Sequence, residues 1–307
     1  VLVTGAGGFV GQHVVRRFMA AGDQVVAVET PDGERRVPND VEATLDASDL
    51  RRSLAAGQPI ADTADLVVHL GAITDTTLAD PTPYRTENVE WSQLIAASCS
   101  ADGVPLVYAS SAAVYGAAAE CSERPPNERP LNAYGQSKLD VDNFVRGTAS
   151  SHSTPVTGLR FFNVYGPGEG HKGRMASMVH QGAQQVRTDG ELRLFGASHG
   201  VDDGGHARDF IFVSDVVDVV WWAAATGSGV RILNCGTGAA RTFRELGEAV
   251  IAALGAGTIR YIPFPAALTE VYQAHTCADL NDLRGAGYTG EFTDLSDGVL
   301  ATVTAGR

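Results

Sequence analysis

The sequence predicts an α/β protein built on a parallel sheet that helices cover on both faces. Short β-branched runs alternate with helix-patterned segments through the first 160 residues, which is the rhythm of repeated βαβ units. These runs are continuously apolar rather than alternating with polar residues, as expected of strands that are buried on both faces. The predicted strands are Val1–Val3, Val25–Val28, Ala43–Leu45, Leu66–Leu70, Val104–Tyr108 and Val156–Leu159.

The helices follow from apolar residues at helical spacing. Between the first two strands these residues are Val10, Val14, Val15, Phe18 and Met19, and Gly22 follows as a stop. Later helices are predicted near 174–187 and 215–225, and another begins at Thr242, because Thr242-Phe-Arg-Glu245 is a capping box. Short strands are predicted at 210–213, 231–234 and 259–262, and the Gly- and Asp-rich stretch 196–207 is predicted to be a flexible loop.

Composition limits the partners. The chain has 307 residues, which allows one large domain or two. Lys and Arg number 23 against 36 Asp and Glu, a net charge of −13, so nucleic acid and membrane surfaces are poor partners. No apolar run reaches the roughly 18 residues of a membrane span. Four cysteines without a CxxC pair favour a reducing compartment, and we expect the cytoplasm.

A glycine-rich turn lies between the first strand and the first helix. In Thr4-Gly-Ala-Gly-Gly-Phe-Val-Gly11, the glycines at 5, 8 and 11 allow a tight turn and close approach of a pyrophosphate to the helix N-terminus. The flanking strand and helix support this interpretation. We therefore predict a Rossmann-type, doubly wound dinucleotide-binding domain at 1–165, to which a strand and helix near 208–240 return. A smaller C-terminal α/β domain at 166–307 would mainly bind substrate.

The choice between NAD and NADP is left open by two opposed charges. Glu29 ends the second strand, where a carboxylate would bind the adenosine ribose hydroxyls of NAD. Arg35 and Arg36 follow and could pair with the 2′-phosphate of NADP, or could be a solvated turn. The balance leans to NADP. Asp46, after the third strand, either accepts a hydrogen bond from adenine or is a plain loop acid.

A serine, a tyrosine and a lysine form the predicted catalytic group. Ser111 lies at the end of the fifth strand, and Tyr134 and Lys138 are four residues apart on one helix face. A nearby ammonium lowers the pKa of a phenol. Tyr134 could then exchange a proton with a carbinol oxygen while hydride moves to or from a nicotinamide, and Ser111 would hold the same oxygen.

Together these residues resemble the extended short-chain dehydrogenase/reductase superfamily, most of whose members act on nucleotide sugars. The resemblance covers essentially the whole chain, including His69-Leu-Gly-Ala72, Asn88 and Arg160-Phe-Phe-Asn163-Val-Tyr-Gly-Pro167. It implies that the cofactor is bound by Gly5, Gly8, Phe9, Val10, Gly11, Glu29, Thr30, Arg35, Asp46, Leu70, Gly71, Ala72, Asn88, Tyr134, Lys138 and Val164.

Downstream segments resemble the ADP-L-glycero-D-manno-heptose 6-epimerases more closely. These segments are 163–177, 208–215, 261–265 and 272–280, and Glu169-Gly-His-Lys172-Gly is the most specific. The resemblance implies inversion at C6 of the heptose, with Tyr134 and Lys172 as the two acid–base groups; the alternative for Lys172 is a phosphate or cofactor contact. The implied substrate-binding residues are Ser111, Asn163, Lys172, Arg174, Gln181, Phe195, Arg208 and Tyr272. A homo-oligomer and a nucleotide-diphosphate sugar as substrate are also implied.

Two departures from this family keep a second function open. The 196–207 loop is longer than expected, and Arg174 replaces a small residue beside the sugar. The alternative is a 4-epimerase, or another extended member acting on a different nucleotide hexose. Ala112-Ala113 after Ser111 argues against a 4,6-dehydratase, which usually has acidic residues there. A cofactor-holding sensor is disfavoured because both Tyr134 and Lys138 are present, and no metal site is predicted.

Overall fold

The computed structural model describes residues 1–269 and 272–305, and in it the chain forms two compact units made of interleaved segments. The first unit comprises 1–116, 128–160 and 217–233, and the second comprises 117–127, 161–216 and 234–307. Within the described residues, no helix is both long and apolar enough to cross a bilayer.

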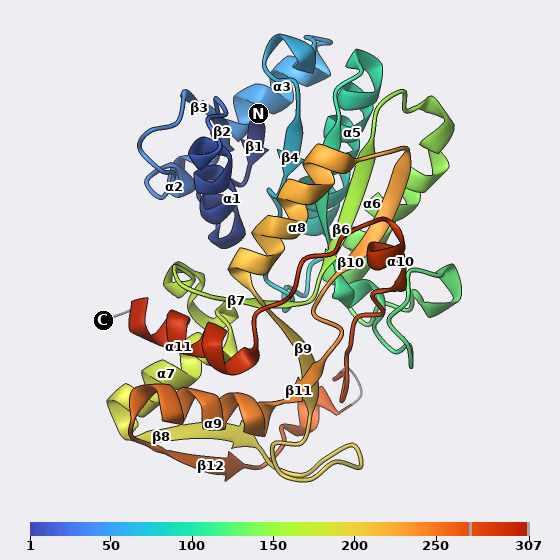
Figure 1. The fold of residues 1–307 in the computed structure, drawn as a ribbon. Helices are drawn as coiled ribbons and strands as arrows, with labels where there is room; N and C mark the ends of the chain where they lie inside the picture. Colours follow the sequence, from blue (N-terminus) through green and yellow to red (C-terminus); the bar gives the residue numbers. More distant parts are fainter. Residues whose placement is uncertain (270–271, 306–307) are drawn as a thin grey trace. The chain divides into compact units, whose positions relative to one another are not determined.

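A seven-stranded sheet organises the first unit, in the order β10-β6-β5-β4-β1-β2-β3 (Figure 1). The order runs outward in both directions from the adjacent β1 and β4, and the β1–β2, β1–β4, β2–β3 and β4–β5 pairs are parallel. This arrangement confirms the predicted doubly wound α/β class. The strands are β1 (Leu2–Thr4), β2 (Val26–Glu29), β3 (Ala43–Asp46), β4 (Val67–His69), β5 (Leu106–Ser111), β6 (Val156–Phe161) and β10 (Val230–Cys235).

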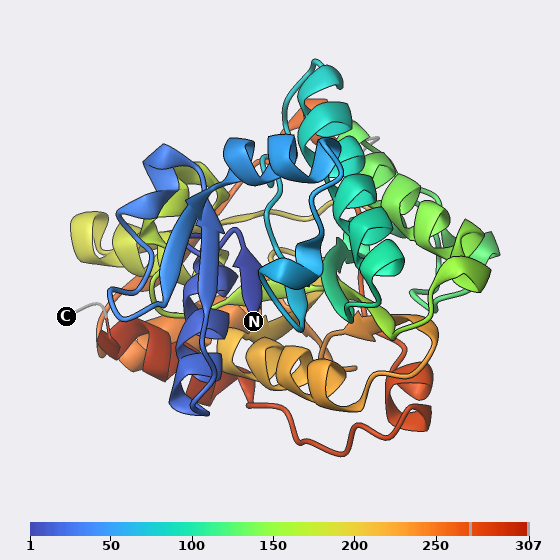
Figure 2. The ribbon, with the colours of Figure 1, turned by 90° about the horizontal axis from the view of Figure 1, so that it is seen from above.

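Helices cover both faces of this sheet (Figure 2). On one face, α1 (Phe9–Ala20) packs against α8 (Val213–Thr226) through Phe18 and Trp221, whose ring centroids are 4.9 Å apart. On the other face lie α3 (Ala47–Ala55), α5 (Trp91–Asp102) and α6 (Ala133–Gly147). Their apolar faces join the sheet in a core that includes Ile95 and Val145, both fully buried. Trp221 is therefore a packing residue of the first unit.

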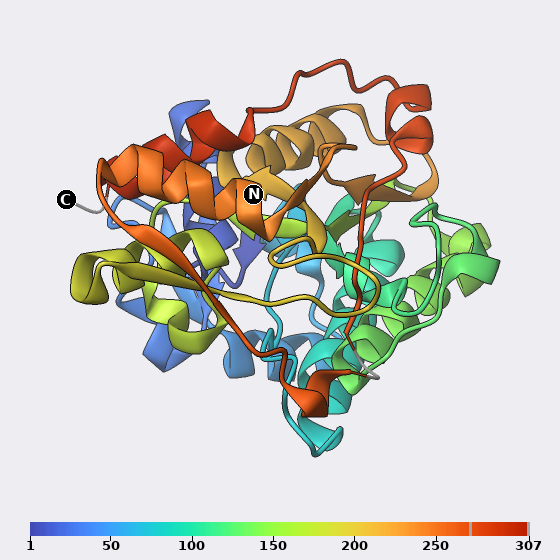
Figure 3. The same cartoon turned by 90° about the horizontal axis from the view of Figure 1, so that it is seen from below.

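The second unit has two small sheets packed with helices (Figure 3). Its three-stranded sheet has the order β11-β9-β7, and its two-stranded sheet pairs β12 with β8. Leu192, Leu246 and Val299 are fully buried in the core that the helices enclose. The elements are β7 (Asn163–Tyr165), α7 (Met178–Asp189), β8 (Glu191–Phe195), β9 (Ala207–Phe212), β11 (Ala240–Thr242), α9 (Phe243–Leu254), β12 (Thr258–Ile262), α10 (Asn281–Gly285) and α11 (Leu295–Ala305).

Short helices complete the chain. They are α2 (Pro31–Glu34), η1 (Ile60–Asp62), α4 (Thr82–Tyr84), η2 (Arg85–Glu90), η3 (Ala112–Val114), η4 (Pro125–Asn127), η5 (Ala149–Ser151), η6 (Gly170–Met175) and η7 (Ala266–Leu268). The η2 segment is a π-helix, whereas the other η segments are 3₁₀ turns.

Two helix starts test the capping arguments. The helix α9 begins at the predicted capping box, in which Thr242 and Glu245 satisfy each other's backbone N–H groups. The helix predicted from residue 174 begins only at Met178, because Ser177 is its N-cap and accepts a hydrogen bond from the His180 amide. Arg174 consequently lies in the preceding η6 turn, which Gly173 breaks with φ +54°.

Candidate active site

The glycine turn forms a cradle at the N-terminus of α1. Gly5 has φ +66°, and its N–H donates to the carbonyl of Val28 at 2.9 Å. A methyl group at residue 11 would overlap the carbonyl oxygen of Gly5, so the backbone can close this tightly only on glycine. Among the described residues, no side chain caps α1 at Gly8. This uncapped helix N-terminus suits a pyrophosphate, so the chain's own residues fit a dinucleotide.

The charged residues after β2 fold back onto this cradle. Glu29 accepts hydrogen bonds from the backbone N–H groups of Gly7 and Thr30, both at 2.8 Å. Arg36 donates from Nε to the carbonyl of Gly7 at 3.0 Å, whereas Arg35 is exposed. Both a carboxylate and a guanidinium are thus hydrogen-bonded to the backbone of the glycine turn.

Asp46 has a structural task of its own. It is the N-cap of α3 and accepts from the Ser48 hydroxyl at 2.5 Å and from the Ser48 amide at 2.7 Å, and these hydrogen bonds lower the pKa of its carboxyl. Asp46 is thus a helix cap rather than a plain loop acid, and its contact with adenine stays a prediction.

A buried histidine joins the ends of β1 and β4. His69 Nδ1 lies 2.7 Å from Thr4 Oγ1, and Nε2 lies 2.9 Å from Ser92 Oγ. Ser92 Oγ donates to the carbonyl of Asn88 at 2.5 Å, so it accepts from Nε2–H, and Nδ1 accepts from Thr4. Thr4 Oγ1 also accepts from the Gly71 amide at 3.1 Å. This network fixes the backbone of the predicted cofactor segment 70–72.

Asn88 lies in the π-helix η2, a type of helix that is frequent at functional sites. It is fully buried. Its side-chain amide accepts a hydrogen bond from the Ile73 N–H at 2.8 Å and donates one to the Ile73 C=O at 3.1 Å. Its Nδ2 also donates to Ser137 Oγ at 3.1 Å, and Ser137 Oγ donates to the carbonyl of Tyr134 at 2.7 Å. Asn88 therefore orients the first turn of α6, which carries Tyr134.

The structure brings Ser111, Tyr134 and Lys138 together. Burial raises the pKa of the Tyr134 phenol, and a hydrogen bond with Ser111 opposes this rise. Lys138 Nζ lies 6.0 Å from the centroid of the Tyr134 ring and donates to the carbonyl of Ala109 at 2.9 Å. Burial lowers the pKa of Lys138 to about 8, so its ammonium is close to its titration range at neutral pH.

In the second unit, Lys172 lies in the short helix η6 beside a buried carboxylate. Its Nζ is 4.0 Å from Glu169 Oε2, and the Glu169 side chain is fully buried. Burial lowers the pKa of Lys172, and Glu169 opposes this effect. Gln181 donates to the carbonyls of Arg174 at 3.1 Å and Ala176 at 2.6 Å, so its amide braces this loop.

Arg208 and Tyr272 form a second cluster in this unit. The Arg208 guanidinium carbon is 4.8 Å from the Tyr272 ring centroid, and that ring is 6.2 Å from Phe195. Arg208 donates to the carbonyl of Ala207, whereas Asp209 accepts from Thr237, Gly238 and Ala278. The guanidinium is therefore directed by aromatic packing rather than by an ion pair with Asp209. Asn163 is exposed on β7, next to Val164.

The 196–207 loop adds two histidines to this cluster. His206 is buried, and its ring centroid lies 5.1 Å from that of Tyr272. His199 has φ +54°, and Ser198 Oγ is hydrogen-bonded to both imidazoles. Within the described residues, no group of three or more His, Cys, Asp or Glu side chains is arranged to hold a metal ion.

The predicted site residues divide between the two units. Tyr134, Lys138, Ser111, Asn88 and the glycine cradle belong to the first unit, and Asn163, Val164, Lys172, Arg174, Gln181, Phe195, Arg208 and Tyr272 belong to the second. Two buried carboxylates, Asp142 and Glu169, were not predicted as site residues. Their spacing from the lysines, four residues after Lys138 and three before Lys172, was the available sequence signal.

The fold and the geometry of these residues define a class of dinucleotide-binding protein, and the comparison with protein families agrees with this class. Residues 1–236 match the model of the NAD-dependent epimerase/dehydratase family. The chain belongs to this family, which confirms the predicted superfamily of extended short-chain dehydrogenases/reductases.

Individual relatives within this family show more specific similarities. The chain is 41% identical over 305 residues to ADP-L-glycero-D-manno-heptose-6-epimerase of Alkalilimnicola ehrlichii, covering 97% of this chain and 95% of the relative. The solved ADP-L-glycero-D-manno-heptose-6-epimerase of Helicobacter pylori is 27% identical, with a TM-score of 0.84 over 99% of this chain and 94% of that chain. MoeE5, solved in complex with UDP-glucuronic acid and NAD, is 28% identical, with a TM-score of 0.81 over 100% of this chain and 98% of that chain.

Proposed function

We propose that this chain inverts C6 of ADP-glycero-manno-heptose by transient oxidation and re-reduction with a bound NAD(P). The 41% identical relative carries this activity in its name. The observation that carries the proposal is the pair of lysines. The chain contains 21 arginines but only two lysines, Lys138 and Lys172. A sequence that otherwise uses arginine retains lysine at these two positions, and of these two cationic side chains only lysine can give up its proton in a protein.

Tyr134 acts as the base toward one face of the sugar. Its phenol takes the C6 hydroxyl proton, Ser111 donates a hydrogen bond to the same oxygen, and the Lys138 ammonium favours the phenolate. The bound cofactor supplies the chemistry of hydride acceptance and return at C6. After the ketone turns, the opposite alcohol forms only when a second acid protonates the carbonyl oxygen in its new orientation.

Lys172 is that second acid in this proposal. Burial lowers its pKa, which makes release of its proton easier. Arg208, flanked by Tyr272, suits the diphosphate of the substrate, because a guanidinium stays charged and binds phosphate through two parallel hydrogen bonds. Asn163, Arg174, Gln181 and Phe195 are proposed to complete the substrate site.

NADP is proposed as the preferred cofactor. Arg36 is held against the Gly7 carbonyl, and Arg35 is exposed beside it, so two guanidinium groups are available to a 2′-phosphate. Glu29 favours NAD instead, because its carboxylate would repel that phosphate. Denaturing the purified protein and identifying the released nucleotide by mass spectrometry tests the choice, and finding NAD contradicts it.

The test of the activity uses ADP-D-glycero-D-manno-heptose and follows the configuration at C6 by NMR. Conversion by the wild type is expected, with Tyr134→Phe losing at least about a hundredfold in kcat. Lys172→Arg keeps the charge but cannot release a proton, so it should lose as much as Lys172→Met. Full activity of Lys172→Arg would instead assign this residue to a phosphate or cofactor contact.

The second candidate is a 4-epimerase, or another family member, acting on a different nucleotide hexose. Arg174, where a small residue was expected beside the sugar, and the long 196–207 loop favour it. Turnover of a UDP- or TDP-hexose without conversion of the ADP-heptose would select this candidate.

A further inference from the structure

Each of the two lysines has a buried carboxylate close to it in the sequence. Asp142 follows Lys138 by one helical turn on α6, and Glu169 precedes Lys172 by three residues. Both acidic residues are fully buried. A buried carboxylate is costly unless several donors hold it, so the donors around each reveal what it organises.

Asp142 ties α6 to β5. Its Oδ1 accepts from the Tyr108 hydroxyl at 2.9 Å, and its Oδ2 accepts from Ser110 Oγ at 3.0 Å. Both donors lie on β5, one and three residues before Ser111. Since Lys138 Nζ donates to the carbonyl of Ala109 on the same strand, two successive turns of α6 are fastened to the end of β5.

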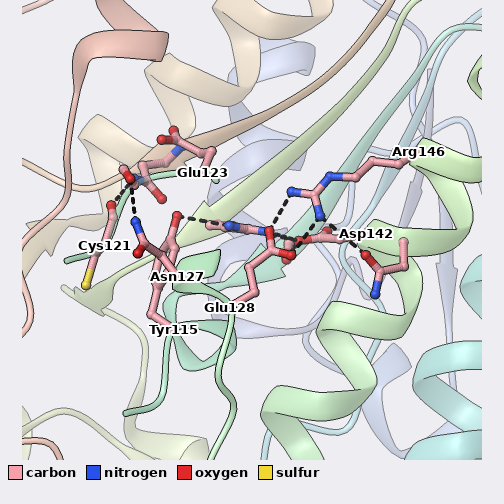
Figure 4. Close-up of polar contacts among 12 residues, drawn as sticks. Tyr115, Cys121, Glu123, Asn127, Glu128, Asp142 and Arg146 are labelled. Atoms are coloured by element: carbon pink, nitrogen blue, oxygen red, sulfur yellow. Dashed lines mark hydrogen bonds and ion pairs between the residues drawn. The ribbon is translucent and has the colours of Figure 1, made fainter. Parts of the chain in front are cut away.

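Arg160 balances the charge of Asp142, which Figure 4 shows together with Glu128 and Arg146. Its guanidinium is fully buried and donates from Nε to Asp142 Oδ2 at 2.9 Å. It also donates to Glu128 and to the Tyr115 hydroxyl, and Glu128 is paired in turn with Arg146. Two guanidinium groups therefore face two carboxylates. Burial raises the pKa of Asp142, whereas Arg160 and the two hydroxyls favour its ionised form.

Glu169 performs the corresponding task in the second unit. Its Oε2 accepts from the Ser177 amide at 2.6 Å, and its Oε1 accepts from Ser177 Oγ at 2.6 Å and from the Gly166 amide at 3.4 Å. The carboxylate therefore joins both ends of the loop that carries Lys172. The loop encloses the carboxylate, and the amine lies 4.0 Å from Oε2.

We propose that Asp142 and Glu169 are positioning residues, each of which holds one lysine in place and keeps its amine charged, so that Lys138 can favour the Tyr134 phenolate and Lys172 can act as an acid. The inference rests on the proposed function for the meaning of the two lysines. Among the described residues, the other titratable or charged groups beside Lys138 or Asp142 are Tyr134, Tyr108, Arg160 and the neutral His69. On η6 and the first turn of α7, next to Lys172 in the chain, they are His171, Arg174 and His180. None of these groups supplies a negative charge at neutral pH, so loss of the carboxylate lowers the pKa of its lysine.

The scarcity of lysine provides the experiment. Protein labelled with ¹³C-lysine gives side-chain resonances from two lysines, which can be assigned by Lys138→Arg and Lys172→Arg and titrated by NMR. Asp142→Asn should lower the pKa of Lys138 by at least about one unit and leave Lys172 unchanged. Glu169→Gln should do the reverse. Glu128→Gln is the matched control, because it removes a carboxylate from the Arg160 network without facing either lysine.

Activity is the second readout. The alkaline limb of the pH profile of kcat should move to lower pH in Asp142→Asn and stay in place in Glu128→Gln, even where both variants lose stability. Unmoved lysine titrations in folded Asp142→Asn and Glu169→Gln would overturn the proposal and leave both carboxylates with a structural role alone. The titration requires no sugar turnover, so its failure is distinct from absence of the proposed activity.

Two further variants test the proposal if Asp142→Asn or Glu169→Gln does not fold. Asp142→Asn combined with Arg160→Met removes both buried charges, leaves Glu128 paired with Arg146, and should lower the pKa of Lys138 as the single variant does. Glu169→Asp keeps the charge but withdraws it by one methylene, so the pKa of Lys172 should fall by less than in Glu169→Gln. An unchanged lysine pKa in both of these variants contradicts the proposal.

Discussion

The buried His69 makes the stability of the first unit depend on pH. Its imidazole is neutral in the folded chain, because Nε2–H donates to Ser92 and Nδ1 accepts from Thr4. Burial lowers its pKa from 6.5 to about 3. Protonation of Nδ1 would place a second donor against the Thr4 hydroxyl, which already receives the Gly71 amide hydrogen.

The sign and size of the effect follow from linkage. Below its pKa of 6.5, the histidine of the unfolded chain binds a proton that the folded chain excludes down to about 3. Stability therefore falls as the pH falls through this window, at about 1.4 kcal/mol per pH unit. Between about pH 7.5 and about pH 5, the loss attributable to His69 is about 2 kcal/mol.

Urea unfolding of the wild type and His69→Gln, followed by circular dichroism at several pH values, measures this quantity. Glutamine can donate to Ser92 and accept from Thr4 but does not titrate. His152 and His206, whose pKa values are also lowered, contribute equally to both proteins and cancel in the difference. The wild type should lose about 2 kcal/mol relative to His69→Gln over this window. A difference independent of pH would refute the reasoning.

Three further outcomes are expected. Gly11→Ala should weaken NAD(P) binding at least about tenfold by fluorescence titration, because the new methyl group overlaps the carbonyl of Gly5 and opens the cradle; unchanged binding would contradict the assigned cradle. Thr242→Ala should lower the free energy of unfolding by about 1 kcal/mol, because the capping box with Glu245 is lost; urea titration measures it, and no change would contradict the cap. Asp209→Asn should destabilise the protein by about 1–3 kcal/mol, because at least one of the backbone N–H groups that now donate to the Asp209 carboxylate is left unpaired. A thermal midpoint equal to that of the wild type would refute this prediction.

The features that were predictable from the sequence depend on residues close together in the chain. The alternation of apolar strands with amphipathic helices gave the order of the elements, and the glycine turn is recognisable because its strand and helix are adjacent. The Tyr134–Lys138 spacing is a single helical turn, and the capping box at Thr242 spans four residues. Such patterns depend on residues a few positions apart, so backbone geometry alone determines which local structure forms.

The helix expected from residue 174 shows where local patterns fail. Its apolar spacing continues upstream of residue 178, but the Ser177 cap and the positive φ of Gly173 end it there. Ser177 is held in the capping position by Glu169, eight residues away. Counting apolar residues at helical spacing does not detect that hydrogen bond.

Tertiary structure alone decided which distant side chains share a buried environment. Asp142 meets Tyr108 and Arg160 because β5 and β6 are neighbours in the sheet, and His69 meets Thr4 because β1 lies beside β4. These partners are 18 to 65 residues apart, so no short-range pattern specifies them. Their pKa values depend on desolvation and on charges brought close by the fold, which is why the sequence supplied the reactive groups and the folded chain supplied their protonation states.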